Sequence, residues 1–275
     1  MTAAFAGGVD VFGLCDVGLK RKQNEDHFLI ASLRKTIDLR QTNLEDQRIF
    51  EALRGTEAQL MVVADGVGGQ PGGALASGTA VSALVEYLAR TTSCFSSMDT
   101  NHEHEFLAEL ERAVHEAHAR VKSASGTARP PATTLTMVTL VWPRAYLVHV
   151  GDSRAMYLHQ GWLRPLTRDQ TMGEAMVDAG AMSAEDAAKS RLASTLYSAL
   201  GAEDMEPTVG LVDFVPGDVL LLCSDGLPKH VSDERIKEVL GQPVTAEAMA
   251  RTLVADALAG GGSDNVTVVV ARMIG

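Results

Sequence analysis

A short turn between two apolar runs constrains the fold of this chain more than any other feature. The β-rich runs at 133–141 and 146–150 are separated only by residues around Trp142, Pro143 and Arg144. A parallel crossover needs a dozen or more residues, so the two runs must pair as an antiparallel hairpin. The sequence therefore favours a layered α+β sandwich over a doubly wound parallel sheet.

The other expected elements agree with a layered fold, because helical patterns occur in pairs between groups of short strands. Further strands are expected at 9–15, 27–33, 60–64, 219–223 and 266–273, and helices at 73–90, 103–122, 172–179, 233–240 and 246–258. We expect one domain over residues 1–275. The polar, Ala-rich segment 167–200 is expected to form a helical flap on it.

Charge and cysteine content exclude several functions. The chain has 35 Asp and Glu against 24 Lys and Arg, a net charge of -11, whereas nucleic-acid binding requires clustered basic residues. No apolar run approaches the roughly 20 residues of a membrane helix, and the N-terminus does not resemble a secretory signal. Three widely spaced cysteines form neither a disulfide framework nor a zinc motif. We therefore expect a cytoplasmic protein that binds neither nucleic acid nor membrane.

Acidic residues lie at the ends of expected strands in four places. Asp65 and Asp225 each end an apolar strand and precede a glycine, and further acidic groups lie at 24–26 and 263–265. Mg²⁺ and Mn²⁺ take oxygen ligands and often use few carboxylates plus several waters. Any one of these sites alone is more typical of a turn or a helix cap. The combination of four favours a metal site.

Short motifs follow one another in a specific order along nearly the whole chain. They include NED at 24–26, VADGVGG at 63–69, VGDSR at 150–154, CSDGL at 223–227 and DNVT at 264–267. In these motifs the chain resembles the PPM family, the metal-dependent type 2C serine/threonine protein phosphatases, in its compact bacterial form. The resemblance implies a four-layer αββα sandwich, with two central antiparallel sheets flanked by helix pairs and a metal centre at one edge.

The resemblance also assigns the metal ligands. It implies that Asp65 bridges two metal ions and that Gly66 offers its carbonyl oxygen to one of them. Asp225 and Asp264 complete the other metal site. Glu25 would hold metal-bound water directly or from the second layer of contacts.

Four further residues receive supporting roles from the same resemblance. Arg21 is expected to grip the substrate phosphate, since its planar fork suits two phosphate oxygens. Asp152 is expected to help bind a third, weaker metal ion. Asp26, like Glu25, is expected to hold metal-bound water directly or from the second layer of contacts, and Asn265 is expected to orient its neighbour.

The implied reaction is hydrolysis of phosphoserine and phosphothreonine in proteins by direct attack of a metal-activated water, at a centre of two Mn²⁺ or Mg²⁺ ions. The implied partners are phosphorylated proteins, including a serine/threonine kinase or its targets, and a monomer is expected. Val67 follows Gly66 where some family members carry a histidine proposed as the general acid. Residues 169–171 also depart from the usual pattern, which leaves substrate choice open.

Two alternatives remain at this point. Cys15 and Arg21 have the Cys-x5-Arg spacing of thiolate-based phosphatases, but the loop between them contains Asp16 and lacks the usual flanking residues. The second alternative is a catalytically weak phosphatase-like module that regulates or binds proteins. It predicts the loss of at least one metal ligand, whereas all are present. The segment 34–59 looks longer than usual, and nothing in its residues indicates a role.

Overall fold

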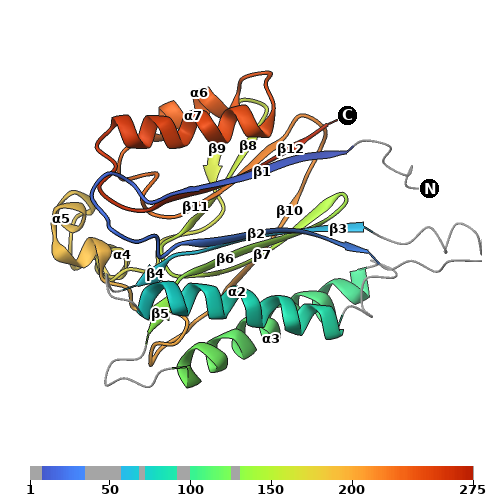
Figure 1. Cartoon of the computed structure of the whole chain (residues 1–275), viewed down its shortest axis with the longest axis horizontal. Helices are drawn as coiled ribbons and strands as arrows, with labels where there is room; N and C mark the ends of the chain where they lie inside the picture. The colour runs from blue at the N-terminus through green and yellow to red at the C-terminus, as the bar shows by residue number, and fades with distance from the viewer. Residues whose placement is uncertain (1–7, 35–56, 68–71, 92–99, 125–130, 275) are drawn as a thin grey trace, which may run out of the picture.

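The computed structural model describes residues 8–34, 57–67, 72–91, 100–124 and 131–274. Ten of its strands form two antiparallel sheets that pack face to face (Figure 1). The first sheet has the order β1 (Val9–Asp16), β12 (Val266–Met273), β11 (Val219–Cys223), β8 (Arg154–His159) and β9 (Trp162–Pro165). The second has the order β10 (Thr208–Asp213), β7 (Arg144–Val150), β6 (Leu135–Val141), β3 (Glu57–Ala64) and β2 (His27–Arg34).

Two helix pairs cover the outer faces of the sheets, as Figure 1 shows. The pair α6 (Asp233–Leu240) and α7 (Ala246–Ala259) lies on the first sheet, and the pair α2 (Gly72–Thr91) and α3 (Thr100–Ser123) lies on the second. The expected four-layer αββα sandwich is confirmed. Among the described residues, no helix is long and apolar enough to cross a membrane.

The buried strands explain why the sequence shows continuous apolar runs. All seven residues of β6 are buried, and successive side chains of a strand point to opposite faces. Met137 and Val141 pack toward α2 and α3, whereas Val138 and Leu140 pack between the two sheets. Because both faces of the strand are covered, no polar alternation remains.

The expected hairpin is present, but the first run is not one strand. Val141 pairs with Arg144 at the turn, and the pairing continues to Leu135 and Val150. Thr134 interrupts the run, because its backbone N–H donates to Asp65 O at 2.9 Å. Residues before it form the two-residue strand β5 (Ala132–Thr133), which pairs with β4 (Gly66–Val67).

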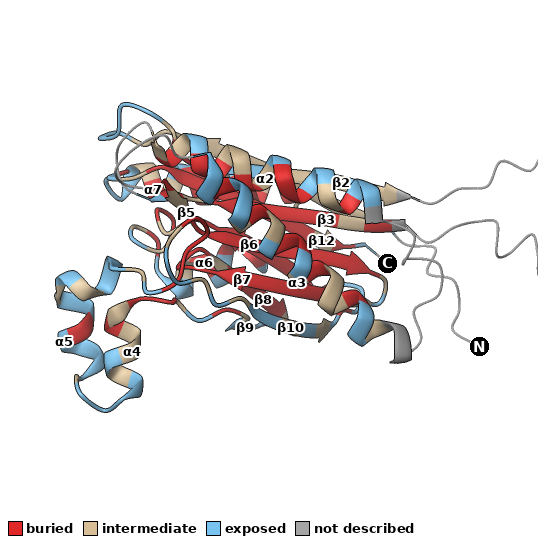
Figure 2. Ribbon diagram, turned by 90° about the horizontal axis from the view of Figure 1, so that it is seen from below, coloured by how far each residue is buried: buried red, intermediate tan, exposed pale blue. Residues whose placement is uncertain are grey.

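The segment 167–200 contains α4 (Met172–Asp178), α5 (Ala184–Lys189) and the 3-10 helix η2 (Arg191–Ser194). In Figure 2 the two α-helices project from the body of the molecule, and α5 is mostly exposed whereas α4 is mostly half-buried. Gly173 and Ala187 are their buried residues. They lie toward the same end of the sandwich as β4 and β5 (Figure 1). The segment 34–59 lies mostly outside the described residues.

Candidate active site

Asp65 lies between β3 and β4, where its backbone is bonded on both sides. Its N–H donates to Thr134 Oγ1 at 3.0 Å. Its carbonyl oxygen accepts from the Thr134 N–H at 2.9 Å and from Thr133 Oγ1 at 2.8 Å. The strand break at Thr134 therefore fixes the direction in which the Asp65 side chain leaves the sheet.

Gly66 lies where two other backbone segments approach closely. A Cβ on this residue would be 2.4 Å from Gly73 C and 2.8 Å from Glu25 O, both backbone atoms. A Cβ on Gly73 would likewise lie 3.0 Å from both Glu25 Oε1 and Gly66 O. The Glu25 carboxyl group and the Gly66 carbonyl are therefore neighbours beside Asp65.

We predict that Gly66→Ala destabilises the fold by about 1–3 kcal/mol, the usual cost of overpacking, because the atoms it meets are backbone and cannot rotate away. Urea unfolding of the purified protein measures this. Gly210→Ala is the control, since its Cβ would meet Leu147 at an ordinary 3.5 Å. Equal stability of the two variants would contradict the close approach at Gly66.

Asp26 joins the two sheets at this edge. Its Oδ2 accepts from Ser224 Oγ at 2.8 Å and from Thr267 Oγ1 at 2.7 Å. Asp26 directly precedes β2 of the second sheet, whereas Ser224 follows β11 and Thr267 lies in β12, both strands of the first sheet. Its Oδ1 is buried and has no hydrogen-bond partner among the described residues. Buried polar atoms are nearly always paired, so this carboxylate oxygen is free to accept a contact from a bound cation or its water.

Asp264 and Asn265 lie just before β12. Asn265 Oδ1 accepts from the Glu25 N–H at 2.9 Å, and its Nδ2 donates to Val17 O at 2.9 Å and Gln23 O at 3.0 Å. Asn265 thus ties the loop between β1 and β2 to the start of β12. This contact brings Glu25 and Asp264 to the same edge.

Two basic side chains hold Asp264. Arg21 Nε lies 2.7 Å from Oδ1 and its NH2 donates to Oδ2 at 2.9 Å, which is a bidentate pair. Lys229 Nζ lies 2.8 Å from the same Oδ2 and 2.5 Å from Asp225 Oδ2. Burial acts to raise the pKa of Asp264, but the bonds from Arg21 and Lys229 outweigh it and the pKa is lowered.

The carboxyl groups of Asp65, Asp152 and Asp26 lie among other carboxylates, and the pKa of each is raised. Burial, and next the charge of Asp26, raise the pKa of Asp65 well above its usual range, with Asp225, Asp152 and Asp264 contributing. Burial and the charge of Asp225 raise the pKa of Asp152 to about 7. Burial also raises the pKa of Asp26 to about 6, against the bonds from Ser224 and Thr267. A cation at their centre would relieve this repulsion.

We call Glu25, Asp26, Asp65, Asp152, Asp225 and Asp264 the acid cluster. The structure brings every residue that the sequence nominated to this edge of the sandwich. Within the described residues, however, no three of these side chains already stand close enough to hold a metal ion. Their chemistry fits Mg²⁺ or Mn²⁺, which prefer carboxylate and carbonyl oxygens.

The loop that carries Asp152 is held by the buried His149, which is 1% exposed. His149 Nε2 donates to Arg168 O at 3.2 Å, and Nδ1 lies 2.9 Å from Thr136 Oγ1. Thr136 Oγ1 in turn donates to Ser153 O at 3.0 Å. Burial lowers the pKa of His149 from 6.5 to about 4.

We predict that His149 makes the fold sensitive to acid. Below pH 6.5 the unfolded chain binds a proton at this residue, whereas the folded chain does not until about pH 4, so stability falls as the pH falls through this range. The loss is about 2 kcal/mol between pH 6.5 and pH 5. Urea unfolding of wild type and His149→Gln measures it as a difference. Parallel stability profiles for the two proteins would contradict a neutral His149.

A model of the protein phosphatase 2C family (PP2C_2) matches residues 40–259, about four fifths of the chain. The chain belongs to the protein phosphatase 2C family. The match does not extend to Arg21, Glu25 or Asp264. This match confirms the family that the sequence motifs indicated.

Relatives of known structure place the whole chain in this 2C-type fold. The serine/threonine phosphatase PstP of Mycobacterium tuberculosis superposes with a TM-score of 0.77 at 31% identity, over 97% of this chain and 99% of that one. A structure of the PstP catalytic domain in complex with two manganese ions gives 0.74 at 31% identity, over 97% and 99% of the chains.

Sequence comparison agrees with the structural one. The M. tuberculosis PstP sequence is 38% identical over 221 residues, which is 79% of this chain. The chain spans about two fifths, 41%, of the length of that relative. A serine/threonine phosphatase of Listeria monocytogenes is 30% identical, over 84% of this chain and 90% of its own length.

Within the 2C-type fold, Cys15 is a half-buried residue of β1. Its Sγ accepts from Asn24 Nδ2 at 2.9 Å and lies 2.8 Å from Thr267 Oγ1. Burial raises the pKa of the Cys15 thiol, whereas a nucleophilic cysteine needs a lowered pKa. The side chain of Arg21 pairs with Asp264 instead. The thiolate alternative is therefore disfavoured.

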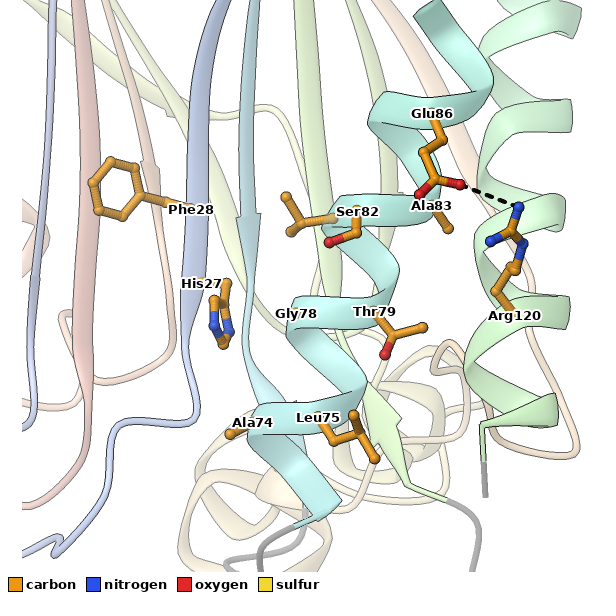
Figure 3. Close-up of a pocket in the computed structure, with 11 residues that line it drawn as sticks. His27, Phe28, Ala74, Leu75, Gly78, Thr79, Ser82, Ala83, Glu86 and Arg120 are labelled. Atoms are coloured by element: carbon orange, nitrogen blue, oxygen red, sulfur yellow. Dashed lines mark ion pairs between the residues drawn. The ribbon is translucent and has the colours of Figure 1, made fainter. Parts of the chain in front are cut away.

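A hollow of about 440 Å³ lies apart from the acid cluster, between β2 and α2. Figure 3 shows His27 and Phe28 on one side and the α2 residues on the other, with the ion pair between Glu86 and Arg120 at its far end. None of the acid-cluster residues lines it. Its position gives it no part in the chemistry of the cluster.

Sequence reasoning missed several residues of this edge. Ser224 and Thr267 orient Asp26, Thr134 fixes Asp65, and Lys229 pairs with two carboxylates. The signal for Ser224 and Thr267 was present, since they lie inside the motifs at 223–227 and 264–267. Lys229 follows Asp225 by four residues, which places both on one helical turn.

Proposed function

We propose that this chain is a metal-dependent serine/threonine protein phosphatase that hydrolyses phosphoserine and phosphothreonine. The observation that carries the proposal is the convergence on Asp65 of carboxylates from separate loops, with the buried Asp26 Oδ1 left without a partner. The names of the relatives and the two manganese ions in the PstP complex support it.

The acid cluster would hold two Mn²⁺ or Mg²⁺ ions. Asp65 and the Gly66 carbonyl would contact one of them, while Asp65, Asp225 and Asp264 would contact the other. Glu25 would reach the metals directly or through water. Asp152 would contribute to a third, weaker site. When bound, such ions activate water and neutralise charge on the phosphoryl oxygens.

The protein's own residues position the substrate and the ligands. Arg21 lies at the exposed side of the cluster, where its fork can bind two phosphate oxygens. Ser224 and Thr267 hold Asp26, and Asn265 holds the loop of Glu25 against β12. These contacts fix the ligands before substrate arrives, which lowers the cost of organising the site during the reaction.

We further propose that the substrates are phosphorylated proteins, including a serine/threonine kinase or its targets, and that the protein acts as a cytoplasmic monomer. The chain would form one phosphatase domain over residues 1–275. The helices α4 and α5 lie toward the same end as the cluster (Figure 1), so they would form the flap that contacts substrate beyond the phosphate.

Hydrolysis of a phosphothreonine peptide by purified protein tests the proposal. Activity should appear with Mn²⁺, disappear with excess EDTA and survive thiol alkylation. Sensitivity to alkylation, with activity in EDTA, would favour the cysteine mechanism instead. A folded protein without turnover under any metal would favour the alternative, a phosphatase-like regulatory or protein-binding module.

A further inference from the structure

Lys229 occupies the position of a cation between two of the proposed metal ligands. Its Nζ lies 2.5 Å from Asp225 Oδ2 and 2.8 Å from Asp264 Oδ2. Asp225 follows β11 and Asp264 precedes β12, so the ammonium group joins two separate loops. A divalent ion held by the same two carboxylates would need the same oxygen atoms.

The backbone keeps Lys229 beside these oxygens. Its N–H donates to Asp225 O at 3.2 Å, which closes one helical turn. The next residue, His230, donates from Nδ1 to Gly260 O at 3.1 Å. Its Nε2 accepts from Ser263 N–H at 2.9 Å and from Ser263 Oγ at 2.8 Å. The turn that carries Lys229 is therefore fastened to the loop before Asp264.

The Lys229 side chain can still leave the site. Its side chain is 37% exposed, against 21% for Asp225 and 18% for Asp264. The ammonium group on a flexible stem can swing into water while the backbone stays in place. The carboxylates cannot follow, because each is attached at a strand end.

We propose that Lys229 is an internal counter-ion of the metal site, which holds Asp225 and Asp264 together without metal and competes with a divalent ion for them. The inference rests on the proposed function, because it requires these two aspartates to bind metal. Because an incoming metal ion must displace the ammonium group from both carboxylates, wild type should bind it on the order of tenfold more weakly than a variant without Lys229, after allowance for solvent exposure.

Isothermal titration of the full chain with Mn²⁺ tests the inference, comparing wild type with Lys229→Met. We expect a dissociation constant at least roughly tenfold lower in the variant. Lys229→Arg keeps the charge and should bind like wild type. Lys189→Met is the matched control, since it removes an exposed ion pair with Glu185 far along the chain from both aspartates.

Thermal unfolding separates competition from a merely structural role. In EDTA, Lys229→Met should unfold at a lower temperature than wild type, because two carboxylates lose their counter-ion. In saturating Mn²⁺, the unfolding temperature of the variant should equal or exceed that of wild type. If Lys229 were purely structural, its substitution would lower the unfolding temperature both in EDTA and in Mn²⁺.

The outcomes distinguish this inference from the proposed function. Metal binding by wild type, with equal or weaker binding by Lys229→Met, overturns the inference and leaves the function standing. An absence of binding in both proteins overturns both proposals. Binding by the variant alone supports the inference in its strongest form, in which Lys229 blocks the site.

Discussion

Asp65→Asn is expected to lower phosphopeptide hydrolysis by on the order of 10³-fold or more, at saturating Mn²⁺. The side chain keeps its shape but loses the charge around which Asp26, Asp152, Asp225 and Asp264 gather. A neutral amide offers a metal ion one weak oxygen ligand in place of a carboxylate. The rate of phosphothreonine peptide hydrolysis measures the effect.

The same substitution should stabilise the metal-free protein. Burial and neighbouring charges raise the pKa of Asp65. The contribution of Asp65 to folding stability is therefore fully present below its usual pKa and is lost as the pH rises through the raised pKa of the folded state. In EDTA at pH 7.5, Asp65→Asn should therefore unfold at a higher temperature than wild type, and Mn²⁺ should stabilise only wild type. Asp204→Asn, an exposed residue outside the cluster, is the control. Loss of activity together with loss of metal-free stability would point to misfolding instead.

Arg21→Ala is expected to lower kcat/KM for the phosphopeptide roughly 10²-fold to 10³-fold, the cost of one lost group that stabilises transition-state charge. The guanidinium reaches the acid cluster through its bidentate pair with Asp264, which holds it at the proposed phosphate position. Steady-state kinetics with the peptide measures the loss. Arg21→Lys should recover little of the lost kcat/KM, because an ammonium group cannot make two parallel hydrogen bonds to the phosphate oxygens.

Lys20→Ala and Lys22→Ala are the matched controls for Arg21, since both neighbours are exposed cations. A general electrostatic attraction for phosphate would make all three variants similar. Mn²⁺ affinity should not fall in Arg21→Ala, because the substitution releases Asp264 for metal. Weaker Mn²⁺ binding would mean that Arg21 supports the metal site rather than the phosphate.

The sequence predicted the parts of this fold that depend on local patterns. The hairpin of β6 and β7 followed from the shortness of its turn, and α6 was predicted with its observed bounds because Ser232 caps it. Strands β8, β9 and β10 were missed. β9 has four residues, and β10 is largely exposed, so neither forms the apolar run that indicates a strand.

The contacts that complete the candidate site depend on the tertiary fold. Thr134 belonged to an apparent strand, and only its bonds to Asp65 show why the strand breaks there. Lys229 and Asp264 lie 35 residues apart in the chain. No local pattern predicts that their loops meet, because the antiparallel pairing of β11 with β12 brings them together.

Anomalous diffraction from crystals grown with Mn²⁺ tests most directly whether the acid cluster is the metal centre. The account predicts two strong peaks beside the Asp65 carboxylate, one next to the Gly66 carbonyl and the other next to Asp225 and Asp264, with the Lys229 ammonium displaced. Manganese bound elsewhere on the chain, or none at this edge under conditions where the enzyme turns over, would contradict it.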